Sequence, residues 1–202
     1  MTTAAQEFER LGGHPALELV NTVAWRLDDT LTSDRLTDAE ALVRWAGDAG
    51  LVGNENLRAL LAECASEPGR AERLIRRTRA FRELLYRVLS AVATGGSPGD
   101  DDIEALRRAM TRALGRAEIS GLAPLRWSLR PGALADLPDV LTLSGWELMQ
   151  FEDLGRLRRC ADDACGWLFL DRSRNGTRRW CSSADCGNRA RARRHYRRHG
   201  RT

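Results

Sequence analysis

No apolar run in the 202-residue sequence approaches the roughly 20 residues that a membrane-spanning helix needs. The first residues also lack a basic stretch followed by an apolar one, which is the pattern of a secretory signal. We therefore expect a cytoplasmic protein with no membrane partner. Because that compartment is reducing, metal ligation by cysteine is favoured there over disulfides.

Lysine is absent as well, so arginine accounts for all 32 strongly basic residues. Genome composition is the first explanation of such a bias, although arginine also suits bidentate contact with phosphate or guanine. The charge is unevenly divided along the chain. Residues 156–202 hold 14 Arg and four Asp, a formal charge of +10, whereas residues 1–155 hold 18 Arg and 24 acidic residues, a charge of −6. We expect the two parts to meet different partners.

Four of the five cysteines lie close together, as Cys160-x4-Cys165 and Cys181-x4-Cys186 with 15 residues between the pairs. Two close pairs separated by a hairpin-length insert are typical of one tetrahedral four-thiolate zinc site. Four thiolates leave no open position for a catalytic water, so the Zn²⁺ is expected to be structural. No Ser-His-Asp, Cys-His or paired-carboxylate spacing is evident, and we expect no enzyme. Cys64 is expected to be a buried, small apolar residue.

The rest of the chain is predicted to be helical, because apolar residues recur at helical spacing between capping and breaking residues. The predicted helices run from Ala16 to Leu27, from a capping box at Thr37 to Gly50, from a cap at Asn54 to Pro68, from Leu74 to Val92, from Asp100 to Leu114 and from Pro138 to Leu154. Residues 125–130 alternate apolar and polar, which predicts one short extended segment. The fold class is therefore mainly α: a helical domain over residues 1–155 and a four-cysteine zinc module over residues 156–202.

Inside the zinc module, residues 166–171 and 178–180 are predicted to be two strands of a hairpin turned at Asn175-Gly176. A final helix is predicted to begin near Cys186. A small zinc domain needs its apolar residues for core, so the module's aromatic residues are expected to be structural; base stacking is the alternative. These residues are Trp167, Phe169 and Trp180.

The final predicted helix carries arginines on most of its faces. A small domain has no partner that neutralises such a helix, which favours contact with a phosphate backbone over a solvated or disordered tail. Positions 188, 191, 195 and 198 share one face, so Asn188 and Arg191 are placed to reach base edges. The candidate DNA contacts are Arg178, Arg179, Asn188, Arg189, Arg191, Arg193, Arg194, His195, Arg197 and Arg198.

Polar residues along the first predicted helix form a second candidate site. Polar side chains that face a helical core can hold a small ligand. The alternative is that they satisfy backbone groups and that Gly12-Gly13 makes a turn. The candidate ligand contacts are His14, Asn21, Thr22 and Arg26.

Several of these stretches resemble a known pair of domains. Cys160-x4-Cys165-Gly-Trp-Leu-Phe-Leu-Asp, then Arg-Trp-Cys181 and Cys186-Gly-Asn-Arg, resembles the CGNR zinc finger. Upstream, Gly-Gly-His14-Pro-Ala-Leu-Glu-Leu-Val-Asn-Thr-Val resembles the opening of the helical ABATE domain, which accompanies this finger in bacterial proteins described as stress-induced transcription regulators. The resemblance implies four cysteine ligands, DNA binding by the finger and a regulatory N-terminal domain. Glu18 stands where Asp is expected.

We therefore expect a bacterial transcription regulator that binds double-stranded DNA through its zinc finger. Its N-terminal domain is expected to sense a signal or a small-molecule effector. A homodimer formed through the helical domain would supply a second half-site. Two alternatives stay open: an RNA-binding module, or a protein-interaction module joined to a helical partner-binding domain.

Overall fold

The computed structural model describes residues 10–199, with side chains through Tyr196. Helices dominate this part of the chain, as predicted. They are α1 (Pro15–Val20), α2 (Ala39–Asp48), α3 (Asn54–Ser66), α4 (Pro68–Ala93), α5 (Asp100–Leu114), α6 (Leu137–Phe151) and α7 (Cys186–His199), with 3-10 turns at Leu134–Asp136 and Leu154–Arg156. Three two-stranded antiparallel pairs join β1 (Val23–Ala24) to β2 (Ser33–Asp34), β3 (Glu118–Leu122) to β4 (Leu125–Ser128), and β5 (Leu157–Arg159) to β6 (Leu168–Leu170). No helix within residues 10–199 is both long enough and apolar enough to cross a membrane.

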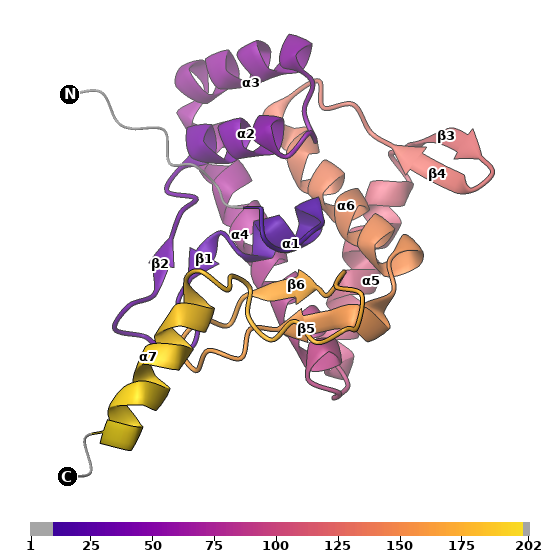
Figure 1. Cartoon of the computed structure of the whole chain (residues 1–202). Coiled ribbons are helices and arrows are strands. Elements are labelled where there is room, and N and C mark those ends of the chain that lie inside the picture. The colour runs from indigo at the N-terminus through magenta and orange to yellow at the C-terminus, as the bar shows by residue number, and fades with distance from the viewer. Residues whose placement is uncertain (1–9, 200–202) are drawn as a thin grey trace.

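The longest helix, α4, organises the helical part. Its apolar residues recur at helical spacing, which places Leu74, Phe81, Leu85 and Leu89 on one buried stripe. This stripe packs in one hydrophobic cluster with residues from α1, α2, α3 and α6. Short α1 lies centrally, between α2 and the β5–β6 pair (Figure 1).

The first helix is shorter than predicted, because α1 ends at Val20 instead of continuing to Leu27. Two polar side chains stop it: Asn21 bonds to a distant backbone, and the Thr22 hydroxyl donates to the Leu19 carbonyl at 2.7 Å. Trp25 has φ +57°, which a right-handed helix does not allow. The apolar pair Val23–Ala24 that suggested helix belongs to β1.

Two predicted helix starts are also off by one residue. Asp38, not Thr37, caps α2, since its carboxylate accepts the Ala41 N–H at 2.8 Å. Gly53 occupies the cap position of α3, so Asn54 is its first helical residue. The extended segment predicted near Leu125 is confirmed as β4; its partner β3 was not predicted, and their hairpin projects from the body (Figure 1).

In the zinc module the predicted strand pairing is wrong. β6 pairs with β5 rather than with residues 178–180, which form no strand. The carboxylate of Asp171 accepts the backbone N–H groups of Ser173 and Arg178, each at 2.9 Å, and so folds the intervening residues into a loop.

The side chains of β6 and of Trp167, which directly precedes it, alternate between two hydrophobic clusters. Leu168 and Leu170 pack with the helical core, whereas Trp167 and Phe169 point to the cysteine side. This is the two-residue period of a strand with both faces covered. The strand therefore joins the helical part to the cysteine cluster by packing.

Candidate functional site

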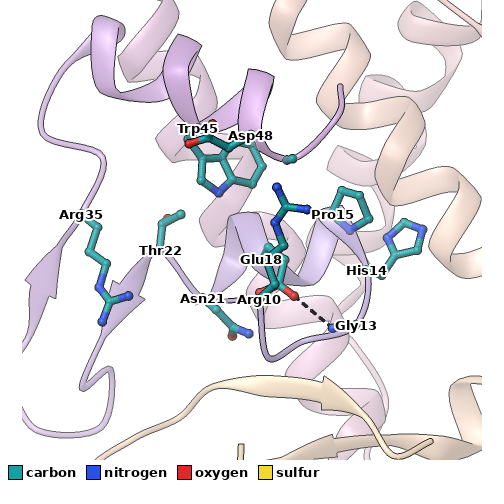
Figure 2. A pocket seen from close by; sticks show the side chains of 11 residues that line it. Arg10, Gly13, His14, Pro15, Glu18, Asn21, Thr22, Arg35, Trp45 and Asp48 are labelled. Carbon is teal, nitrogen blue, oxygen red and sulfur yellow. Dashed lines mark hydrogen bonds between the residues drawn. The ribbon is translucent and has the colours of Figure 1, made fainter. Parts of the chain in front are cut away.

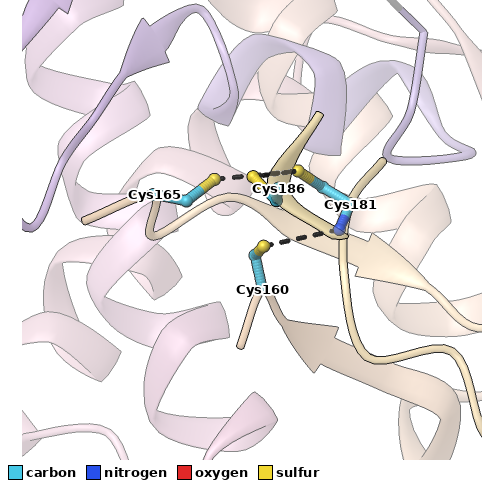
Figure 3. Close-up of side chains that lie close together, drawn as sticks. All are labelled: Cys160, Cys165, Cys181 and Cys186. Atoms are coloured by element: carbon cyan, nitrogen blue, oxygen red, sulfur yellow. Dashed lines mark hydrogen bonds between the residues drawn. The ribbon is translucent and has the colours of Figure 1, made fainter. Parts of the chain in front are cut away.

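The four predicted cysteine ligands lie together, although 26 positions separate the first from the last (Figure 3). Their Sγ atoms all lie within 4.8 Å of one another, with Cys165–Cys181 at 3.7 Å and Cys181–Cys186 at 3.5 Å. Zn–S bonds of about 2.3 Å in a tetrahedron place sulfurs about 3.8 Å apart. Disulfide sulfurs would be about 2 Å apart. The spacing therefore fits four thiolates around one zinc ion.

Neighbouring groups support the negative charge of such a site. The Cys181 N–H donates to the Cys160 Sγ at 3.4 Å, and the Arg189 guanidinium donates to the Cys186 Sγ at 2.9 Å. Donors of this kind orient thiolate ligands and stabilise their charge. The remaining cysteine, Cys64, lies apart on α3, and burial raises the pKa of its thiol to about 11.

The aromatic residues of the module form its core, as the sequence predicts. Phe169 is fully buried, Trp180 packs at the edge of the cluster, and the Trp167 indole donates to the Val23 carbonyl at 2.8 Å. The indole bond ties the finger to β1.

Comparison with family models gives two matches that follow this architecture. Residues 156–199 match the CGNR zinc finger. Residues 13–168, most of the chain, match ABATE, described as "Putative stress-induced transcription regulator". The chain belongs to the ABATE family. A search of curated proteins found no match. The cysteine cluster lies inside the CGNR finger and is consistent with one structural Zn²⁺.

One buried carboxylate fixes the basic helix α7 on the CGNR finger. Asp162, only 1% exposed, accepts from the Arg193 guanidinium at 2.7 Å and from Arg189 at 3.4 Å. Arg189 also pairs with Asp185, and its guanidinium lies 4.2 Å from the centroid of the Trp25 ring. Two of the predicted DNA contacts therefore face the finger and hold α7 in place.

Other predicted contacts lie on the opposite side of α7, which extends away from the body (Figure 1). Asn188, Arg191, Arg194 and His195 are exposed. Arg191 lies about a half-turn from positions 189 and 193, and the other three lie within about 60° of Arg191 around the helix axis. Arg191 donates to the Ser183 carbonyl at 2.9 Å and pairs with Asn188. The side chains of Arg197 and Arg198 lie outside the described part of the chain.

The two candidates before α7 differ in their surroundings. The Arg178 guanidinium donates to the carbonyls of Leu11 at 3.0 Å and Trp180 at 3.1 Å, and stacks 4.2 Å from the Phe169 ring centroid. It therefore links the finger to the segment before α1. Arg179 is exposed, with its guanidinium 5.1 Å from the Trp180 ring centroid.

A cavity of about 240 Å³ lies beside α1 (Figure 2). Three of the four predicted ligand contacts line it: His14, Asn21 and Thr22. Arg26 is not among the lining residues, because its guanidinium bonds to Glu83 at 2.6 Å and to the Val20 carbonyl at 3.0 Å. Its backbone N–H also donates to the Cys165 carbonyl at 3.1 Å, so Arg26 lies between helices and finger.

Asn21 connects the cavity wall to the finger. Its amide donates to the Leu168 carbonyl at 2.8 Å and accepts the Leu168 N–H at 2.9 Å. Next to it, the Leu170 N–H donates to the Gly12 carbonyl at 2.9 Å. Gly12 is needed at this close approach, since a Cβ there would lie 2.8 Å from the Leu17 Cβ and 3.1 Å from the Asn21 amide nitrogen. The edge of β6 away from β5 is thus paired with the cavity wall.

Glu18 is a cavity residue that the sequence analysis did not select. One carboxylate oxygen, Oε1, accepts the N–H groups of Gly12 at 2.9 Å and Gly13 at 3.0 Å. The other, Oε2, is buried and has no hydrogen-bond partner among the described residues. Burial raises the pKa of this carboxyl, and the backbone donors only partly oppose the shift. The sequence signal was an acidic residue within the apolar run of α1, directly after a glycine pair.

Proposed function

We propose that this protein is a transcription regulator that binds duplex DNA through the outer face of α7. In this proposal residues 156–202 are the DNA-binding module and residues 1–155 are the sensing domain. The proposal rests on how the side chains of α7 are distributed around the helix. Arg189 and Arg193 anchor it to the finger, and Asn188, Arg191 and Arg194 point outward. A helix that binds nucleic acid needs one side that holds it on the protein and another side that presents basic residues to the phosphates.

The anchoring of α7 on the finger favours binding in a DNA groove, because a helix that is already ordered loses less conformational entropy on binding. The zinc ligand Cys186 is the first residue of α7, and the buried Asp162 holds the next two turns. A helix fixed in this way presents its polar side chains without a further loss of backbone freedom. The major groove, about 12 Å wide, admits such a helix.

A charge-matched comparison tests the proposal. In the zinc-loaded full chain, we expect R191Q/R194Q to weaken binding to a duplex by about tenfold or more and to reduce the slope of log K against log salt by about two. The control R44Q/R76Q removes two exposed arginines from α2 and α4 and should leave the slope unchanged. Equal effects of the two double variants would contradict the role of α7. A structured RNA that displaces the duplex at lower concentration would assign the finger to RNA instead.

We further propose that the helical domain senses a small ligand in the cavity beside α1. The support is the shared wall: Asn21 lines the cavity and also bonds both backbone groups of Leu168 in the finger. A ligand that moves or stiffens this wall changes the position of β6 and, through the cysteine cluster, of α7. Such coupling requires different contacts of the ligand in the two states.

A further inference from the structure

The cavity beside α1 has the size of a site for a small molecule. Its volume is about 240 Å³, a little below the roughly 300–1,000 Å³ of pockets that hold drug-sized ligands. Its walls come from α1 and the residues on either side of it, from α2 and from the residue that follows β2 (Figure 2). Polar side chains and an aromatic ring both line it, which is the usual composition of a ligand site.

Glu18 lines this cavity and carries an acceptor without a partner, Oε2, which surrounding protein atoms cover. Its side chain is more than nine-tenths buried, and its Oε1 is already used by the Gly12 and Gly13 N–H groups. Oε2 has no hydrogen-bond partner in the described part of the chain, and a buried acceptor without a donor is unfavourable. A ligand that donates N–H groups would give Oε2 its missing donor once the covering side chains shift, and a charged ammonium would do so most strongly.

Two guanidinium groups border the same cavity. Arg10 and Arg35 line it together with the carboxylates of Glu18 and Asp48, so the formal charges of the lining cancel. Guanidinium groups bind carboxylates in a bidentate manner. A neutral lining with separated charges of both signs is complementary to a zwitterion, whereas a simple cation or anion would leave one pair of charges unmatched.

The apolar part of the wall defines the rest of the ligand. Trp45 of α2 and Pro15 of α1 line the cavity beside the charged groups. An apolar substituent on the ligand would pack against them and be removed from water.

From these contacts we propose that the cavity binds a free α-amino acid with an apolar side chain. Its ammonium group bonds to Glu18, its carboxylate to Arg10, and its side chain packs against Trp45. The proposal rests on the sensing role given above to the helical domain and names the ligand class of that domain. Binding would replace the missing partner of Glu18 one turn from Asn21, whose amide holds the finger.

The test uses the zinc-loaded full chain and each of the common amino acids at millimolar concentration. Thermal unfolding should shift upward with apolar amino acids, because a ligand that binds only the folded state stabilises it by mass action. For the best of them, calorimetry should give at least about tenfold weaker binding for the amine that lacks its carboxylate and for the acid that lacks its ammonium group. Absence of any shift across the whole set would overturn the proposal, as would equal binding of the amine or of the acid.

Variants locate the binding. E18Q keeps an oxygen for the Gly12 and Gly13 N–H groups but removes the negative charge, and it should weaken binding by about tenfold or more. R10Q changes an exposed residue and tests the carboxylate partner without disturbing the core. The control E55Q changes an exposed residue of α3 that does not line the cavity. Wild-type affinity in both E18Q and R10Q would overturn the assignment.

Duplex binding measured without amino acid keeps this result separate from the proposed function. If the α7 variants lose DNA binding but still bind the amino acid, the result bears on the DNA-binding role of the finger and leaves the ligand proposal standing. A chain that binds DNA but no amino acid refutes the ligand class alone.

Discussion

Replacing Asn21 with alanine removes both hydrogen bonds that join the cavity wall to the finger. The Asn21 side chain is 3% exposed and bonds to the N–H and C=O of Leu168, which is fully buried. Each buried backbone group left without a partner costs about 1–3 kcal/mol, so the free energy of unfolding should fall by about 2–6 kcal/mol. Asn21→Asp should also destabilise the fold, because a carboxylate can accept the Leu168 N–H but repels the Leu168 carbonyl.

The assay is urea unfolding of the zinc-loaded protein, followed by circular dichroism. Asn54→Ala is the matched control, since Asn54 is exposed and makes no capping hydrogen bond in α3; its effect should stay within about 0.5 kcal/mol. An Asn21→Ala variant as stable as this control would refute the reasoning, and so would an Asp variant as stable as the wild type.

Three further predictions concern Gly166 at the same interface, the ion pair of Asp34 with Arg82 inside the helical part, and the metal centre. Gly166 has φ +72°, and a Cβ there would lie 2.9 Å from the Arg26 Cβ, so Gly166→Ala should lower the free energy of unfolding by about 1–3 kcal/mol in the same assay. Burial opposes the charge of Asp34, but its hydrogen bond and ion pair with Arg82 outweigh this and lower the pKa of the carboxyl. The ion pair therefore stabilises the fold above about pH 4, and this stabilisation is lost as the pH falls through the lowered pKa. The urea midpoint of Asp34→Asn should lie below that of the wild type at neutral pH, and the difference should shrink in acid. A difference that does not change with pH would contradict this prediction. Chelation under reducing conditions should release one zinc per chain and unfold the finger, observed as loss of helical signal and faster proteolysis, which readdition of zinc reverses.

The sequence predicted what local patterns determine. The cysteine spacing identified the ligand cluster, because two close pairs need only a connecting segment to meet. The apolar stripe from Leu74 to Val92 predicted α4 because its period repeats through many turns. The last ligand, Cys186, begins the final helix as expected.

Long-range contacts explain the errors. The apolar residues after Asn21 continue a helical pattern, but α1 ends there because Asn21 bonds to Leu168, 147 positions away. The Asn175-Gly176 turn signal is local, and it favoured a hairpin with residues 178–180. In the structure β6 pairs with β5 instead. The inward turn of Arg189 depends on the buried Asp162, which no spacing rule connects to it.

The most direct test of the central claim is fluorescence anisotropy of the zinc-loaded chain with the DNA upstream of its own gene and with a shuffled duplex of equal length, across a salt series. The account predicts tighter binding to the native sequence and a decrease of log K by about 0.9 per phosphate contact for each unit of log salt. Equal binding to both duplexes, or binding that salt does not weaken, would contradict the role of α7 as a helix that reads DNA.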